Sequence, residues 1–296
     1  MAWGAQQWVR LTKEATFGTF DASATAPNIN WLRLPGNNAC TIRATPQRQI
    51  IRSADGGNRK RQVVANRKVV AGNISTLFYP TQAAKMFEAA MTLTSNALPS
   101  YTVDYWDTVS EHRFLGCTVQ SLAATGTATQ DYLPMTIGFL GQKQDTPVTL
   151  TEPATTVFPA ETPYQHYESK GLLSIGGVIT KYSSLGFSLK NVLDGTWDED
   201  QWVTAIVYCG RDMELDVKLQ YISSTLRAAL EAQTALTITS AWARTAGLTT
   251  TIDLKTKSYV ASVADDLPLN NAGYQTVKIE TFYDQAATTD FAFTVA

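Results

Sequence analysis

The clearest periodic pattern in the chain is an alternation of apolar and polar side chains between residues 213 and 221. Its apolar positions are Met213, Leu215, Val217, Leu219 and Tyr221. Its polar positions are Glu214, Asp216, Lys218 and Gln220. A period of two sends successive side chains to opposite faces of a strand, so this segment is predicted to be a half-buried β-strand. We expect the apolar set to face a core and the polar set to form the other face.

Two helices are predicted from apolar stripes with helical spacing. After Pro80, the stripe falls at i, i+3, i+4 and i+7, on Ala83, Met86, Phe87 and Ala90. It predicts a helix over residues 81–91. A second stripe follows two serines that can cap a helix, and it predicts a helix over residues 223–233. Its positions are Leu226, Ala229 and Leu230.

The order of these patterns occurs twice along the chain. Phe87-Glu88-Ala89 returns as Leu230-Glu231-Ala232, and Tyr132 returns as Tyr274, at nearly the same offset. Strand patterns over residues 63–79, 101–119 and 135–139 have counterparts at 213–221, 250–263 and 277–281. A constant offset and a shared order indicate an internal duplication.

A segment between the two copies is rich in proline, threonine and glutamate, a composition typical of an extended linker. We therefore expect a first domain at 1–145, a linker at 146–166 and a second domain at 167–296. With so many strand patterns and two short helices, the fold is predicted to be mainly β.

Two ten-residue segments share a pattern but carry opposite charge. Ser53 to Gln62 and Val192 to Gln201 both have Asp-Gly third and fourth and Gln last, at Asp55-Gly56 and Asp194-Gly195. The first continues with Arg59, Lys60 and Arg61, and the second with Asp198, Glu199 and Asp200. One interpretation is a pair of solvated hairpin tips, where a single ion pair contributes only about 0 to 1 kcal/mol. The other is a pair of interface loops, in which many copies act together.

Charge and cysteine content narrow the class of protein. The net charge is -2, from 24 Lys plus Arg against 26 Asp plus Glu, which gives no overall attraction to nucleic acid or to membranes. The three cysteines form no CxxC pair, so neither a disulfide framework nor a zinc site is expected. No basic leader and no apolar run of about 20 residues is seen, so we expect a soluble protein made in the cytoplasm.

Catalytic chemistry has little support in the sequence. The two histidines, His112 and His166, have no motif around them, and no nucleophile elbow, phosphate-binding loop or zinc-protease motif is present. The acids around Asp198 do not have the spacing of a calcium loop. We therefore expect no catalytic residue, no metal and no cofactor, and we expect the many aromatic rings to pack in cores and interfaces.

Several segments resemble the tail tube (major tail) protein of long-tailed bacteriophages, in the type where the tube domain is duplicated. The longest is LLSIGGVITKYSSLGFSLKNVLDG, from Leu172 to Gly195. TPQRQIIRSADGG, GNISTLFYP and EATFGT are similar to elements of the same family. The resemblance implies two tandem β-sandwich domains, each flanked by one short α-helix.

The resemblance also implies a function. Six such domains close into a ring, so three duplicated chains would form one ring, and rings stack into a tube that conducts DNA in the virion tail. Expected partners are other copies of the chain and the tape-measure, tail-terminator and distal tail proteins, with assembly in the host cytoplasm and no membrane insertion. An alternative is a two-domain β-sandwich adhesin or receptor-binding module of a virion.

Within a tube, the resemblance assigns roles to the residues singled out above. Glu214, Asp216, Lys218 and Gln220 would face the lumen, which we expect to be neutral to acidic because Lys and Arg bind phosphates strongly. Both ten-residue segments would lie at ring or subunit interfaces, the basic one meeting carboxylates and the acidic one meeting cations of a neighbouring chain.

Overall fold

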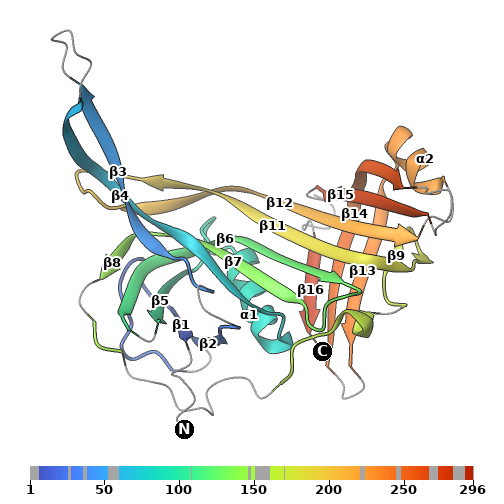
Figure 1. The fold of residues 1–296 in the computed structure, drawn as a ribbon, viewed down its shortest axis with the longest axis horizontal. Coiled ribbons are helices and arrows are strands. Elements are labelled where there is room, and N and C mark those ends of the chain that lie inside the picture. The colour runs from blue at the N-terminus through green and yellow to red at the C-terminus, as the bar shows by residue number, and fades with distance from the viewer. Residues whose placement is uncertain are drawn as a thin grey trace.

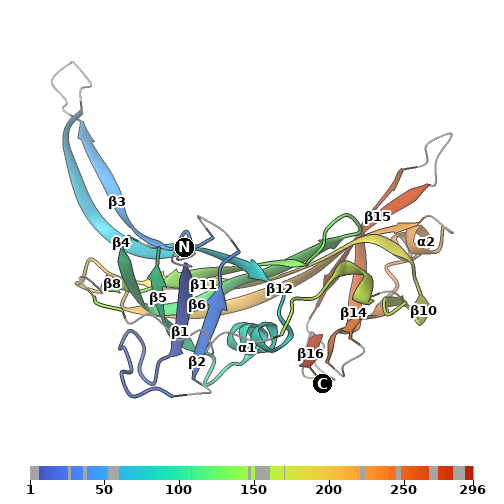
Figure 2. The same cartoon turned by 60° about the horizontal axis from the view of Figure 1, so that its bottom comes forward.

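The computed structural model describes residues 7–25, 28–35, 39–52, 60–107, 109–145, 148–150, 161–169, 171–220, 224–244, 248–266, 273–282 and 291–295. The fold is mainly β, a large antiparallel sheet accompanied by two α-helices, as predicted, and consistent with a β-sandwich. Long strands run the length of the molecule, with α1 on one side of them (Figures 1 and 2).

The elements of the first half end at residue 145. In chain order they are β1 (Trp8–Lys13), β2 (Ile29–Arg33), β3 (Arg43–Arg52), β4 (Lys60–Leu77), α1 (Pro80–Met91), β5 (Ser100–Trp106), β6 (Glu111–Thr127), β7 (Pro134–Gly141) and β8 (Lys143–Asp145). Helix α1 begins with Pro80, whose ring favours the first helical position, and it matches the predicted helix. The β3–β4 hairpin projects beyond the sheet in Figure 1.

The elements of the second half follow a short 3-10 turn, η2 (His166–Ser169). They are β9 (Ser174–Ile175), β10 (Val178–Ile179), β11 (Tyr182–Thr196), β12 (Ala205–Gln220), α2 (Thr225–Glu231), β13 (Leu236–Ala243), β14 (Thr249–Asp266), β15 (Tyr274–Thr281) and β16 (Phe291–Val295). Helix α2 is shorter than the predicted 223–233. It stops before Gln233, whose φ of 50° is left-handed and cannot continue a helix.

The strands have the same order in both halves. In the first, neighbouring strands follow the order β3-β4-β7-β6-β5-β1-β2, with β8 on β6. In the second, they follow β11-β12-β15-β14-β13-β9-β10, with β16 on β14. Every strand of one half therefore has a counterpart with corresponding neighbours in the other.

The two halves share one sheet. Residues 184–190 of β11 pair with residues 121–127 of β6 in antiparallel register, from Ser184 opposite Thr127 to Lys190 opposite Ser121. At this junction the buried Asn191 donates from Nδ2 to the carbonyl oxygens of Ala90 in α1 and Val119 in β6, at 3.0 and 2.9 Å. The end of α1 is thus held by a side chain from the second half.

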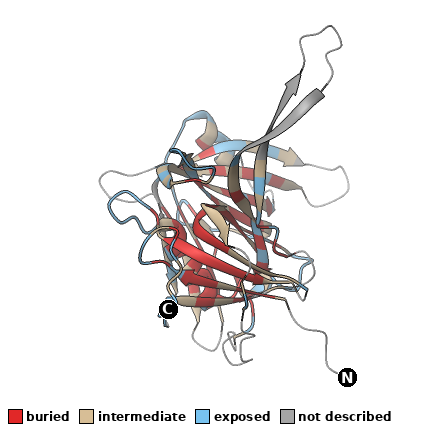
Figure 3. Cartoon of the chain, turned by 90° about the vertical axis from the view of Figure 1, so that its left-hand side faces the viewer, coloured by how far each residue is buried: buried red, intermediate tan, exposed pale blue. Residues whose placement is uncertain are grey.

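The hydrophobic core also extends through both halves. Phe187 of β11 lies 5.3 Å from the ring of Phe87 in α1 and 6.0 Å from that of Phe78, between ring centroids. Phe293 of β16 stacks on Phe87 at 3.8 Å. The buried residues, red in Figure 3, gather in the body of the molecule, so the halves pack as one unit.

Candidate channel-lining face and interface loops

The alternating strand has the orientation that its sequence predicts. Met213, Leu215, Val217 and Leu219 of β12 are buried, whereas Tyr221 lies outside the described residues. Glu214, Asp216, Lys218 and Gln220 lie on the other face of the sheet and are half-buried or exposed. The prediction that the apolar set faces the core is therefore confirmed for these four residues.

This polar face continues across the sheet into the first half. Residues directly opposite one another on adjacent antiparallel strands share a face, so the strand registers trace its rows. One row crosses seven strands and runs through Tyr259, Glu280, Glu214, Ser188, Ala123, Thr136 and Ser75. The face is therefore built mainly of small and polar side chains, and it spans both halves.

The charged residues of this face are concentrated on β12 and its two neighbours. Lys278 Nζ lies 3.0 Å from Glu214 Oε1 and 3.7 Å from Glu280 Oε1. Lys218 Nζ lies 5.0 Å from the centre of the Tyr274 ring. Among described side chains in these rows, the acids are Asp212, Glu214, Asp216 and Glu280, and the bases are Lys190, Lys218, Lys257 and Lys278.

Two pKa shifts follow from this crowding. Partial burial, followed by the charge of Glu214, raises the pKa of Asp216. The hydrogen bond to Glu214 raises the pKa of Lys278. With four acids and four bases, the charges on these rows balance.

The structure corrects the position of one predicted loop. Asp194 and Gly195 are not at a hairpin tip but inside β11, opposite Val207 and Ile206 of β12. The tip comprises residues 197–204. Asp-Gly is a common turn signal, but here cross-strand pairing overrides it. Trp197 and Val203 pack over the strand end, so that a Cβ on Gly195 would lie 3.4 Å from each of them.

The acidic tip lies against the base of the β3–β4 hairpin in the same chain. The Lys68 amide donates to the carbonyl oxygen of Gln201 at 2.7 Å. The Arg67 guanidinium lies 5.0 Å from the Trp197 ring, and Lys68 Nζ lies 5.1 Å from the Trp202 ring, both within cation–π range. Sequence reasoning missed these two tryptophans, although both flank the acidic run.

Asp198, Glu199 and Asp200 are exposed at this tip. They are therefore available to cations outside the chain. Of the basic segment, Asp55, Gly56 and Arg59 lie outside the described residues, while Lys60 and Arg61 form the start of β4 and their side chains are not described.

A family model for phage tail tube proteins matches residues 4–294, nearly the whole chain. The chain belongs to this family. It is a structural tail tube protein, located in the virion tail. No curated protein matches it significantly.

Two further observations on the tail tube protein concern metal ions and membranes. In the part of the chain that the structure describes, no group of three or more His, Cys, Asp or Glu side chains is arranged to hold a metal ion. No helix among the described residues has both the length and the apolar character needed to cross a membrane.

Proposed function

We propose that three copies of this tail tube protein close into a pseudo-hexameric ring, that rings stack into a tube, and that the phage genome passes through it. The observation that carries this proposal is the strand order, which is the same in both halves, together with the continuous pairing of β6 with β11. Two equivalent units already joined side by side make up one third of a six-unit ring. We assign them to residues 1–145 and 167–296, joined by the linker 146–166.

The polar face of β12 and its neighbours is proposed to line the channel. Figure 2 shows α1, β1 and β2 beneath the long central strands, on the side of the core. The other side carries small polar residues and balanced charge, so a duplex could slide past it without strong contacts to its phosphates. Glu214, Asp216, Lys218 and Gln220 would then face DNA.

The partners expected of such a tube are further copies of the chain, with tape-measure, tail-terminator and distal tail proteins at the tube's interior and ends. Assembly would take place in the bacterial host cytoplasm. These assignments rest on family membership.

Electron microscopy of concentrated purified protein tests the proposal against the virion adhesin. A tube protein should form rods of uniform width with a central hole about as wide as a DNA duplex. Discrete oligomers that do not grow with concentration would contradict the proposal and favour the adhesin.

Positive charge on the proposed lumen should make tubes retain DNA. Asp216→Lys with Gln220→Lys adds cations at two exposed positions of β12, and three chains per ring would repeat them along the channel. Because phosphate contacts release counterions, retention of a short duplex should fall steeply between about 50 and 200 mM salt. Co-sedimentation of tubes with labelled duplex measures it.

The matched control is Asp216→Asn with Gln220→Asn, which adds no cation. Its tubes and wild-type tubes should leave the duplex in the supernatant. If the lysine variant also forms tubes but retains no DNA at low salt, this face does not line the channel.

The acidic tip should govern the rate of tube growth. Reversal of Asp198, Glu199 and Asp200 to lysine should leave the thermal unfolding of the monomer nearly unchanged, because these side chains are exposed. Growth should slow by about tenfold or more at low salt, because three ion pairs with a neighbouring chain, each contributing up to about 1 kcal/mol, would become repulsive contacts. Light scattering during assembly provides the rate.

The neutral variant Asp198→Asn, Glu199→Gln, Asp200→Asn should be intermediate, and added salt should reduce the differences. The reciprocal reversal of Arg59, Lys60 and Arg61 to glutamate should also slow growth. Wild-type rates for both reversals across a range of salt would show that the two segments are only solvated turns.

A further inference from the structure

Several strands in the described part of the chain leave one edge unpaired, and two of these open stretches are equivalent to the edges that join β6 to β11. Residues 259–265 of β14 pair with β15 on one side and with no strand on the other. Residues 39–43 pair with β4 on one side and with no described strand on the other. The Thr41 amide donates to the carbonyl oxygen of Asn73 at 2.8 Å, and the Ser75 amide donates to that of Ala39 at 2.6 Å. Open edges present unpaired backbone groups that readily accept another strand.

The open edge of β14 corresponds to an edge of β6 that is occupied. Each of these strands lies between the same neighbours, β7 and β5 in the first half and β15 and β13 in the second. Through those registers, Ala123 of β6 corresponds to Ser262 of β14, since Ala123 lies opposite Thr136 and Ser262 opposite Lys278. On β6, this edge is the one that pairs with β11.

The open stretch at residues 39–43 corresponds to the part of β11 that pairs with this edge of β6. Cys40 bridges to Ile74 of β4, as Phe187 of β11 pairs with Leu215 of β12. Ile74 and Leu215 are themselves equivalent, because they lie opposite Ile137 and Ile279 in the equivalent strands β7 and β15. Residues 39–43 therefore match residues 186–190, which pair with β6 inside the chain.

The two helices differ in burial, as expected if a neighbouring chain covers α2 in the way that the second half covers α1. Helix α1 has seven buried residues and lies against Phe187 and Phe293 of the second half. In the equivalent helix α2, only Ala229 is buried. The side of α2 that corresponds to the covered side of α1 is therefore left open in a single chain.

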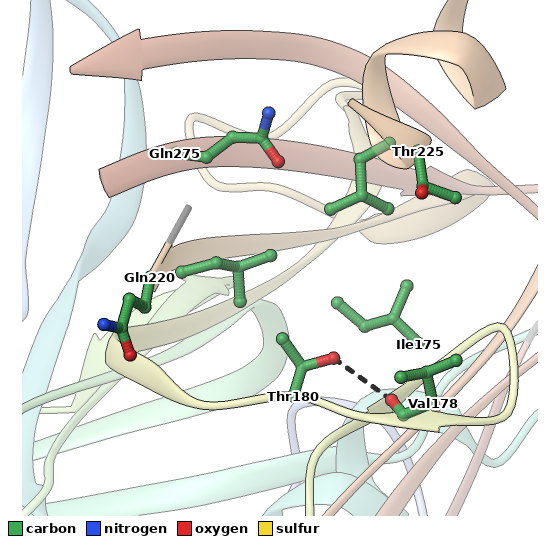
Figure 4. Close-up of a pocket in the computed structure, with 8 residues that line it drawn as sticks. Ile175, Val178, Thr180, Gln220, Thr225 and Gln275 are labelled. Atoms are coloured by element: carbon green, nitrogen blue, oxygen red, sulfur yellow. Dashed lines mark hydrogen bonds between the residues drawn. The ribbon is translucent and has the colours of Figure 1, made fainter. Parts of the chain in front are cut away.

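A hollow of about 160 Å³ lies beside α2, shown in Figure 4. Its lining includes Ile175, Val178, Leu219, Thr225 and Leu226. By the registers above, Leu219 matches Phe78 of the first half. Phe78 is fully buried, and its ring centroid lies 5.6 Å from that of Tyr164 and 5.4 Å from that of Trp242, two residues that follow the first half in the chain. Val178, at the rim of the hollow, is 66% exposed.

We propose that residues 39–43 of one copy pair antiparallel with residues 259–264 of the next copy, with Thr41 opposite Ser262, and that the same copy covers α2 and its hollow. This inference rests on the proposed ring and specifies its subunit contact. The register is that of Ser188 opposite Ala123 inside the chain. The occupant is a second copy because the matching donor strand, already paired at the equivalent internal site, is open on this chain.

The chemistry of the two edges fits this register. The apolar Cys40 and Ile42 would meet Val263 and Val260 on the core side, and all four are buried or half-buried. Thr41 and Ser262, both exposed, would meet on the polar face and extend its rows into the next chain. Since donor and acceptor edges differ, the contact is heterologous and can close a ring.

Disulfide trapping in assembled tubes tests the register. Thr41→Cys and Ser262→Cys are combined in a Cys209→Ser background, because Cys209 is exposed. Cys40 and Cys117 are buried, and burial raises the pKa of the Cys40 thiol to about 12, so these two should not compete. Directly opposite residues lie within disulfide reach.

The control pair is Thr41→Cys with Ala264→Cys, a diagonal pair about 7 to 8 Å apart that should crosslink poorly. We expect the first pair to give covalent dimers and trimers, and nothing larger, on a non-reducing gel. If both variants form tubes but the Thr41 and Ser262 pair gives no crosslink, the proposed register is wrong, whereas the proposed tube is not contradicted. Ladders longer than three chains support the contact and contradict the trimer.

Hydrogen–deuterium exchange of wild-type protein covers the case in which the variants do not assemble. The exchange rates of backbone amides in peptides spanning residues 39–43 and 259–265 should fall at least tenfold when monomers assemble into tubes. Peptides from residues 121–127, already paired with β11, should change less. Unchanged exchange at both open edges in well-formed tubes overturns the proposal.

Discussion

Glu14→Ala is expected to lower the free energy of unfolding by about 3 to 5 kcal/mol. The carboxylate is buried and accepts four hydrogen bonds. Oε2 accepts from Gly18 N and Ser100 Oγ at 2.8 and 2.7 Å, and Oε1 accepts from Thr102 Oγ1 and Gly116 N at 2.8 and 2.9 Å. It thereby joins the loop after β1 to β5 and β6.

Alanine would leave all four donors facing a void, and each buried donor without a partner costs about 1 to 3 kcal/mol. The two hydroxyls can turn to other acceptors, but the backbone amides of Gly18 and Gly116 cannot, which sets the expected range. Glu14→Gln keeps one acceptor oxygen and should have an intermediate effect. Urea unfolding of the monomer measures both.

Glu88→Ala is a suitable control because Glu88 is exposed on α1, where substitutions change stability by about 0.5 kcal/mol or less. A loss below about 1 kcal/mol for Glu14→Ala would show that the four hydrogen bonds contribute little.

Asn191→Ala should cost about 2 to 4 kcal/mol and weaken the junction between the halves. Its amide nitrogen donates to two carbonyl oxygens, one at the end of α1 and one in β6. Alanine leaves both buried oxygens without this donor and creates a small cavity. Asn191→Asp should cost more, because it places a carboxylate against those carbonyl oxygens.

Lys190→Ala provides the matched control, since Lys190 is the preceding residue of β11 and its side chain is exposed. It should change stability by about 0.5 kcal/mol or less. Unfolding curves of the three variants, followed by far-ultraviolet circular dichroism, measure the differences. Equal stability of Asn191→Ala and Lys190→Ala would mean that the side chain does not hold the halves together.

Local patterns predicted the elements of the fold well. The alternation from Met213 to Leu219 and the stripe from Ala83 to Ala90 are repeated over enough residues that one face of each element must be buried. The Asp-Gly signal at Asp194 failed because two residues carry little information against fourteen cross-strand pairs between β11 and β12.

Long-range pairing was not accessible from the sequence. The alternation of Leu185, Phe187 and Leu189 puts Asn191 on the core face of its strand, but nothing in the local pattern identifies the carbonyl oxygens of α1 and β6 that its amide reaches. The correspondence of Arg43 with Lys190 was hidden as well. These positions differ by 147 residues, whereas the visible matches, such as Tyr132 with Tyr274, differ by 142, so insertions between them shift the repeat.

Cryo-electron microscopy of assembled tubes would decide whether three chains close into each ring, because one cross-section shows both the number of chains in a ring and the relation between their halves. We predict six similar lobes with true threefold symmetry around an open channel, with β12 and its neighbours on the inner wall. Six chains in each ring, or a wall in which the β12 face points outward, would contradict it.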